Sequence, residues 1–199
     1  MRAMTSPTTS GPTISQHPAV DQAVTTAAPS EAGLIQGYFR HVAAEDLPGS
    51  AEDVTAIITA HRRLASTRRP GEGLIRCYNP PAGSDGWGGT STIIDIVNDD
   101  MPYLVDSVVG ELTDAGVTVH RVLHPILAVR RDADGALVEV LDEAGTDPVV
   151  GDAVVESWMH LLVDRLADAE RVEGVEADLR SALTDVRWIV TDTPAMSAQ

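Results

Sequence analysis

Two apolar stripes at helical spacing lie before residue 70. Positions three and four residues apart repeat along each stripe, which predicts two short helices. The stripes consist of Leu34, Ile35, Tyr38, Phe39 and Val42, and of Val54, Ile57, Ile58, Ala60 and Leu64. Ser50 follows Pro48-Gly49, where its side chain can cap the second helix. We therefore expect an N-terminal helical segment over residues 31–69.

The remainder of the chain predicts an α+β domain over residues 72–192. Short β-branched or alternating runs predict strands at 74–78, 91–97, 117–122, 123–129, 137–141 and 186–190. Apolar positions at helical spacing predict helices at 104–112, 152–168 and 175–183. Asp134-Gly135 predicts a hairpin turn, and Pro/Gly-rich stretches at 79–89 and 145–151 predict loops.

The order of these elements favours a ferredoxin-like fold. Strand, helix, strand, strand, helix, strand can form two interleaved right-handed halves, giving a four-stranded antiparallel sheet with both helices on one face. The hairpin favours this arrangement over a doubly wound sheet, because it forces an antiparallel pair. The other face needs a cover, and either the two N-terminal helices or a second subunit can provide one.

Residues 1–30 show no comparable pattern. They are rich in Thr, Ser, Pro and Ala, with almost no large apolar residues, so we expect a disordered tail. The same composition excludes a signal peptide, and no stretch of the sequence reaches about 20 consecutive apolar residues. We therefore expect a cytoplasmic protein.

The composition of this 199-residue chain narrows its chemistry. All 14 basic residues are arginine, so mechanisms that need a lysine are excluded. The net charge of −16 argues against nucleic acid and membrane surfaces as partners, since the one basic group is too small to reverse it. That group is Arg62, Arg63, Arg68 and Arg69. The single Cys77 can form neither an internal disulfide nor a thiolate metal site, and we expect it to be a core residue.

The junction between the strand at 91–97 and the following helix is the best candidate for a ligand site. Helix N-termini attract anions, and carboxylates at this junction could hold an amino group. The candidate residues are Asn98, Asp99, Asp100, Met101 and Tyr103. The alternative is that Asp99 or Asp100 caps the helix, which is the commoner use of such residues.

The histidines do not indicate a metal site. His120 and His124 lie on a predicted strand, about 13 Å apart, and cannot share one ion. We place His160, with Glu156 and Asp164, on the polar face of the predicted helix at 152–168. The glycines also lack the dinucleotide fingerprint after a strand. We therefore expect no catalytic residues and no cofactor in this chain.

Several runs of sequence are similar to one known family. They are DIVNDDMPYLVDSV at 95–108, GVTVHRVLHP at 116–125, RRDADG at 130–135, ESWMH at 156–160 with Asp164-Arg165, and YFRH at 38–41. Over residues 30–190 the chain resembles the N-terminal region of the large, multidomain NAD-specific glutamate dehydrogenases of bacteria. The resemblance implies ACT-like regulatory domains here, which have the strand and helix order given above.

The same resemblance implies a function. The family's catalytic lysine and NAD site lie downstream, so this chain would be a non-catalytic regulatory or assembly domain of a longer enzyme that converts L-glutamate to 2-oxoglutarate and ammonia. Its partners would be the downstream domains, other copies through a sheet face or edge, and a small amino-acid effector. The first alternative is a free-standing amino-acid sensor and dimerisation module. The second is an enzyme that uses Asp99, Asp100 and a histidine.

Amino-acid-binding ACT modules usually have a glycine after the proline of the first strand-to-helix loop. Here Tyr103 follows Pro102. A backbone can approach a ligand most closely at glycine, so the tyrosine favours an architectural role for this loop as much as ligand binding.

Overall fold

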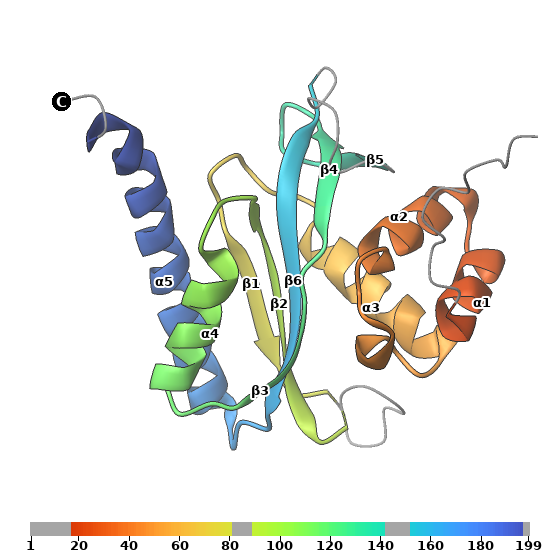
Figure 1. Cartoon of the computed structure of the whole chain (residues 1–199), viewed down its shortest axis with the longest axis horizontal. Coiled ribbons are helices and arrows are strands. Elements are labelled where there is room, and N and C mark those ends of the chain that lie inside the picture. The colour runs from red at the N-terminus through yellow and green to blue at the C-terminus, as the bar shows by residue number, and fades with distance from the viewer. Residues whose placement is uncertain (1–16, 81–88, 142–151, 197–199) are drawn as a thin grey trace, which may run out of the picture.

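The computed structural model describes residues 17–80, 89–141 and 152–196, and it has three layers. Helices lie on both faces of one antiparallel sheet, so the α+β class is confirmed. Helices α4 (Leu104–Asp114) and α5 (Ala169–Met196) cover one face of the sheet (Figure 1). Helices α1 (Pro18–Thr26), α2 (Pro29–Phe39) and α3 (Ala51–Leu64) cover the other. No helix in these ranges is long and apolar enough to cross a membrane.

The sheet has the strand order β1-β2-β6-β4-β5, with β3 also paired to β6. The strands are β1 (Leu74–Tyr78), β2 (Ser91–Asp99), β3 (Val119–Leu123), β4 (Ile126–Arg131), β5 (Leu137–Leu141) and β6 (Val154–Asp164). Strand β6 pairs with β2 along one edge, and with β3 and then β4 along the other. Because both neighbours are antiparallel to β6, β2 and β4 run parallel to each other across it, and α4 makes the crossover between them.

Alternate residues of the central strands pack into two separate hydrophobic cores. Ile94 and Ile96 of β2, with Met159, Leu161 and Val163 of β6, pack with α4 and α5. Their neighbours Val97 and Trp158 pack with the N-terminal helices instead. The N-terminal helices, rather than a second subunit, therefore cover the far face of the sheet.

The expected disordered tail at residues 1–30 is wrong from residue 18 onwards. Residues 18–26 form α1, and α2 begins at Pro29 rather than at residue 31. Ala19 and Ala23 are buried, and they pack in the same core as Ile58 of α3. These small side chains allow α1 to approach α3 closely. A segment without large apolar residues can therefore still bury one face of a helix. Residues 1–16 lie outside the described part of the chain.

The helix expected at 152–168 is also wrong, since residues 154–164 form β6. Residues 156–163 are all buried, which leaves no alternation of exposed and buried positions along the strand. Glu156, Ser157 and His160 interrupt the apolar run and imitate helical spacing. The loop expected at 145–151 lies outside the described residues.

The last predicted strand is wrong as well. A single helix, α5, replaces both the short helix at 175–183 and the strand at 186–190. One apolar stripe continues through the whole region and faces the second core: Val172, Val175, Leu179, Leu183, Val186 and Val190. The sheet position beside β2 is taken by β1, which precedes β2 in the sequence, so the element order differs from the expected one.

Other local predictions are confirmed. Ser50 caps α3, because its side-chain oxygen accepts a hydrogen bond from the backbone of Asp53 at 3.1 Å. The hairpin at Asp134-Gly135 joins β4 to β5, with Gly135 at φ +85°. A Cβ atom on Gly135 would lie 2.5 Å from the carbonyl oxygen of Arg68, so only glycine fits this turn.

Candidate functional site

The predicted ligand loop splits into two parts in the structure. Asn98 and Asp99 turn towards arginine side chains and are used there. Asp100, Met101 and Tyr103 line a hollow of about 310 Å³ on the other side of the loop. The structure therefore does not bring the five predicted residues together into one site.

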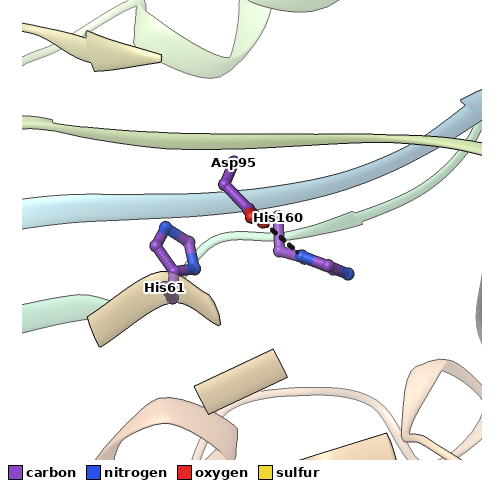
Figure 2. Close-up of side chains that lie close together, drawn as sticks. All are labelled: His61, Asp95 and His160. Atoms are coloured by element: carbon purple, nitrogen blue, oxygen red, sulfur yellow. Dashed lines mark hydrogen bonds and ion pairs between the residues drawn. The ribbon is translucent and has the colours of Figure 1, made fainter. Parts of the chain in front are cut away.

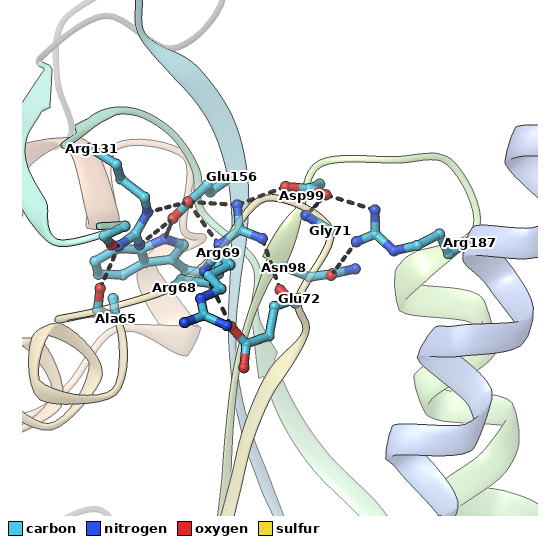
Figure 3. Close-up of polar contacts among 12 residues, drawn as sticks. Ala65, Arg68, Arg69, Gly71, Glu72, Asn98, Asp99, Arg131, Glu156 and Arg187 are labelled. Atoms are coloured by element: carbon cyan, nitrogen blue, oxygen red, sulfur yellow. Dashed lines mark hydrogen bonds and ion pairs between the residues drawn. The ribbon is translucent and has the colours of Figure 1, made fainter. Parts of the chain in front are cut away.

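Asp99 belongs to a group of charged residues that we call the arginine–carboxylate cluster: Arg68, Asp99, Arg131, Glu156 and Arg187 (Figure 3). The guanidinium of Arg68 is 1% exposed and lies 2.6 Å from Asp99 and 2.7 Å from Glu156. Arg131 donates to both carboxylate oxygens of Glu156, at 2.7 and 3.0 Å. Arg187 donates to Asp99 at 2.7 Å.

The electrostatics of this cluster keep both carboxylates ionised. Burial raises the pKa of Asp99, but the hydrogen bonds from Arg68 and Arg187 outweigh it and lower the pKa. Burial likewise raises the pKa of Glu156, and hydrogen bonds from Arg131 and Trp158 together with the charge of Arg68 outweigh it. Carboxylates held in this way are poor proton acceptors at neutral pH. The cluster therefore lacks the chemistry of a general base.

The arginine–carboxylate cluster joins elements from the whole domain. Arg187 comes from α5 on one face of the sheet, and Asp99 from the end of β2. Glu156 and Arg131 come from β6 and β4, while Arg68 lies in the segment between α3 and β1. Arg68 also donates to the backbone oxygen of Glu72 at 2.8 Å. These contacts hold α5 and the α3–β1 segment at the same end of the strands β2, β4 and β6.

Neither Asp99 nor Asp100 caps the following helix. The residue at the N-cap of α4 is Tyr103, and its side chain makes no capping hydrogen bond. Tyr103 has φ 68°, which is strained for a residue with a large side chain. Its ring is 66% exposed and borders the hollow together with Asp100 and His124.

A second group lies between α3 and the sheet, and we call it the buried histidine cluster: His61, Asp95 and His160. Figure 2 shows these side chains converging from α3, β2 and β6. His160 Nδ1 donates to Asp95 Oδ1 at 2.6 Å, and Arg76 donates to Asp95 Oδ2 at 2.6 Å. The His61 ring stacks on Trp158 with the ring centres 5.2 Å apart.

Burial sets the protonation of His61 and hydrogen bonding sets that of Asp95. Burial lowers the pKa of His61 from 6.5 to about 4, so the ring is neutral at pH 7. Its Nε2 therefore donates to the oxygen of Ile96 at 3.1 Å, and its Nδ1 accepts from the hydroxyl of Tyr38 at 2.8 Å. Burial raises the pKa of Asp95, but the hydrogen bonds from His160 and Arg76 outweigh it and bring the pKa to about 2.

Two histidines and a carboxylate are a donor set that divalent transition metals accept, and the three ligand atoms lie within 4.8 Å of one another. However, both His61 nitrogens and both Asp95 oxygens already have hydrogen-bond partners. An ion would displace these partners and lie close to the Arg76 guanidinium. The residues therefore fit a closed hydrogen-bonded cluster better than a metal site.

The remaining candidates are distributed over the surface and the core. His120 pairs with Asp164 at 2.8 Å, and both are exposed. His124 Nε2 is hydrogen-bonded to Ser157, and burial lowers the pKa of His124. Cys77 is a buried core residue, and burial raises the pKa of its thiol to about 12. His160, Glu156 and Asp164 do not share a helix face, because β6 places them in three different environments.

Sequence reasoning missed the buried histidine cluster because its members lie on three elements far apart in the chain. A signal was present for two of them. Asp95 is the one charged residue within the β-branched run 91–97, and a charge inside a buried strand requires a partner. His61 continues the apolar stripe of Val54, Ile57 and Ile58 at helical spacing. His160 could not be found in the same way once residues 152–168 were assigned to a helix.

Residues 34–179 match the family model of the glutamate dehydrogenase ACT1 domain. The chain belongs to this family. Its curated relatives include the NAD-specific glutamate dehydrogenases of Halomonas elongata (38% identical over 125 residues), Pseudomonas aeruginosa (36% over 125 residues) and Mycobacterium tuberculosis (31% over 144 residues). The alignments cover 63%, 63% and 72% of this chain, and 8% of each relative.

The ACT1 match includes most of the polar residues described above. All three members of the buried histidine cluster lie within residues 34–179, and so do Arg68, Asp99, Arg131 and Glu156 of the arginine–carboxylate cluster. Arg187 lies beyond the matched range. The contact from Arg187 to Asp99 therefore joins a residue beyond the matched range to one within it.

Replacing Glu156 with glutamine tests the arginine–carboxylate cluster. Glu156→Gln keeps the shape of the side chain but leaves Arg68 and Arg131 without their shared counter-charge, so we expect the free energy of unfolding to fall by about 3–5 kcal/mol. The matched control is Glu139→Gln on β5, whose side chain is 52% exposed and pairs with Arg130. We expect a loss of at most about 1 kcal/mol there. Urea unfolding at pH 7 measures both, and equal small losses would contradict the assignment.

The lowered pKa of His61 predicts a loss of folding stability in mild acid. Between pH 6.5 and about 4 the unfolded chain binds a proton at His61 that the folded chain does not, so stability decreases as the pH falls through this window. The shift corresponds to about 3 kcal/mol. His61→Phe should lose this part of the pH dependence, although it is less stable at pH 7. Urea unfolding from pH 7 to 4.5 measures it, with His41→Phe as the exposed control. The prediction is wrong if the free energy of unfolding of His61→Phe falls with decreasing pH as steeply as that of the wild-type chain.

Proposed function

We propose that this chain is a non-catalytic regulatory or assembly domain of a larger NAD-dependent glutamate dehydrogenase. The catalytic part of that enzyme would bind NAD and deaminate L-glutamate oxidatively to 2-oxoglutarate and ammonia. The chain belongs to the ACT1 family and spans 8% of the length of the relatives it matches, which carry the dehydrogenase name. The domain itself would contribute contacts and regulation rather than chemistry.

One observation carries this proposal: the carboxylates and histidines of the two clusters are paired with other groups of the same chain. Glu156 and Asp99 are neutralised by arginines, and Asp95 by His160 and Arg76. A catalytic group must reach a substrate, and these side chains face each other within the packed layers. The sequence also contains no lysine, so the catalytic lysine expected in this family has no counterpart here.

We also propose that the sheet is an ACT-like layer in which β1 replaces the usual last strand. Strands β2, β4 and β6 with α4 provide the parallel pair and its crossover, and α5 lies beside α4 on the same face. The helices of the chain cover both faces of this sheet. Contacts with other copies would therefore use an edge strand such as β5, where Val138 is 61% exposed, rather than a sheet face.

A free-standing amino-acid sensor is the second candidate, and the hollow beside the β2–α4 loop favours it. Tyr103 adopts the left-handed φ that a glycine would take at this position, so the loop follows a glycine-like path despite the larger residue. Asp100, Met101 and Tyr103 line the hollow with His124 and Ile126. An amino-acid effector would bind there, without Asn98 and Asp99, because these two contact Arg187.

Two measurements on the purified chain test these functions. We expect no NADH formation from L-glutamate and NAD, and no change in melting temperature with NAD; turnover above that of a buffer blank would contradict the non-catalytic role. The twenty amino acids are then screened in the same melting assay, because a ligand that binds the folded state raises its apparent stability. An increase that Tyr103→Ala alters would favour the sensor, whereas no response favours the assembly role.

A further inference from the structure

A surface groove of about 670 Å³ lies between α3 and the edge strand β1, apart from the hollow at Tyr103. Small side chains of α3, among them Ala56, Thr59 and Ala60, leave this space open. The opposite wall is formed by Arg76 and Tyr78 of β1. The volume lies within the range of small-molecule sites, roughly 300–1,000 Å³.

Arg76 connects this groove to the buried histidine cluster. Its Nη2 donates to Asp95 at 2.6 Å, and its guanidinium lies 4.3 Å from the centre of the Tyr78 ring. The side chain is 32% exposed, so the guanidinium also borders the groove. The Nε of Arg76 is buried and has no hydrogen-bond partner in the described residues. A buried charged donor without an acceptor is costly, so an anion that contacts the exposed part of the same guanidinium from the groove would compensate its charge.

Arg63 provides a second cation at the same groove. It lies one turn beyond Thr59 on α3, and its side chain is exposed. Within the described ranges, Arg63 makes no ion pair, whereas its neighbour Arg62 pairs with Glu31 at 2.9 Å outside the groove. Two guanidinium groups, one fixed by Tyr78 and Asp95 and one on the α3 wall, therefore border one space in a strongly acidic protein.

The lining of the groove selects among anions. The methyl groups of the alanines and the ring of Tyr78 offer apolar contact, which suits an organic body and which inorganic phosphate cannot use. Glu52 also borders the groove and disfavours a multiply charged anion. We propose that the groove between α3 and β1 binds a small organic monocarboxylate, which Arg63 and Arg76 hold by its carboxylate while Ala56, Ala60 and Tyr78 contact its apolar body.

Occupancy of the groove has a consequence inside the sheet. A carboxylate on Arg76 shares the guanidinium that Asp95 now uses, and Asp95 in turn holds His160 at 2.6 Å. Binding therefore changes the environment of the His160 ring, which lies beneath the N-terminal helices. The groove and the buried histidine cluster are coupled through one side chain.

The test is a nuclear magnetic resonance titration of the full chain with isovalerate at constant ionic strength. Isovaleramide, which has the same shape without the charge, and inorganic phosphate are the matched ligands. We expect isovalerate to shift the amide signals along α3 and β1, the Nε–H signal of Arg76 and the ring signals of His160. Both matched ligands should leave these signals in place.

Variants on the exposed face of α3 locate the site without disturbing the core. Arg63→Gln should weaken isovalerate binding roughly tenfold, and Arg62→Gln should leave it within about twofold. Ala56→Trp should block the groove while the melting temperature of the free chain is unchanged, because residue 56 is exposed. The proposal is overturned if isovalerate moves no signal on α3 and β1, if isovaleramide or phosphate binds equally well, or if both arginine variants behave alike.

Discussion

Strand β6 is hydrogen-bonded along both edges and buried on both faces, and the rest of the domain is arranged around it. Its eight central residues, 156–163, are all buried. The odd-numbered apolar residues pack beneath α4 and α5, while Trp158 packs beneath the N-terminal helices. A polar side chain on such a strand has no access to water, so it must find its partner within the protein.

Both polar clusters follow from this constraint. Glu156 at one point of β6 requires Arg68 and Arg131, and His160 four residues later requires Asp95. The partners come from β2, β4 and the segment after α3. The ion pairs and hydrogen bonds of the polar residues on β6 therefore also fix the positions of these elements relative to one another. The residues that look most like catalytic groups in the sequence are therefore the ones that hold the layers together. This pairing is the physical basis of the proposal that the chain is non-catalytic.

The sequence predicted the elements that have a clear helical period, a cap, a turn residue or, as in β2, a β-branched run. It failed where the residue types of one element imitate those of another. Helices α3 and α4 and the β4–β5 hairpin follow from periodicity, a serine cap and Gly135. Strand β6 has no alternation, because Glu156 and His160 are buried beside Trp158 and imitate a helix. The β-branched end of α5 suggested a strand, although Val186 and Val190 continue its apolar stripe. Asn98 and Asp99 were found as polar residues at a junction, but their arginine partners are 31 and 89 residues away in the sequence.

Native-state hydrogen exchange of the backbone amides shows whether residues 154–164 form an enclosed strand. These amides donate across β6 to β2, β3 and β4, so they can exchange only when the sheet separates. We predict that residues 156–163 are among the slowest-exchanging in the chain, with carbon chemical shifts of extended backbone. Helical chemical shifts over this segment, or exchange as fast as that of an exposed helix, would show that these residues are not an enclosed strand.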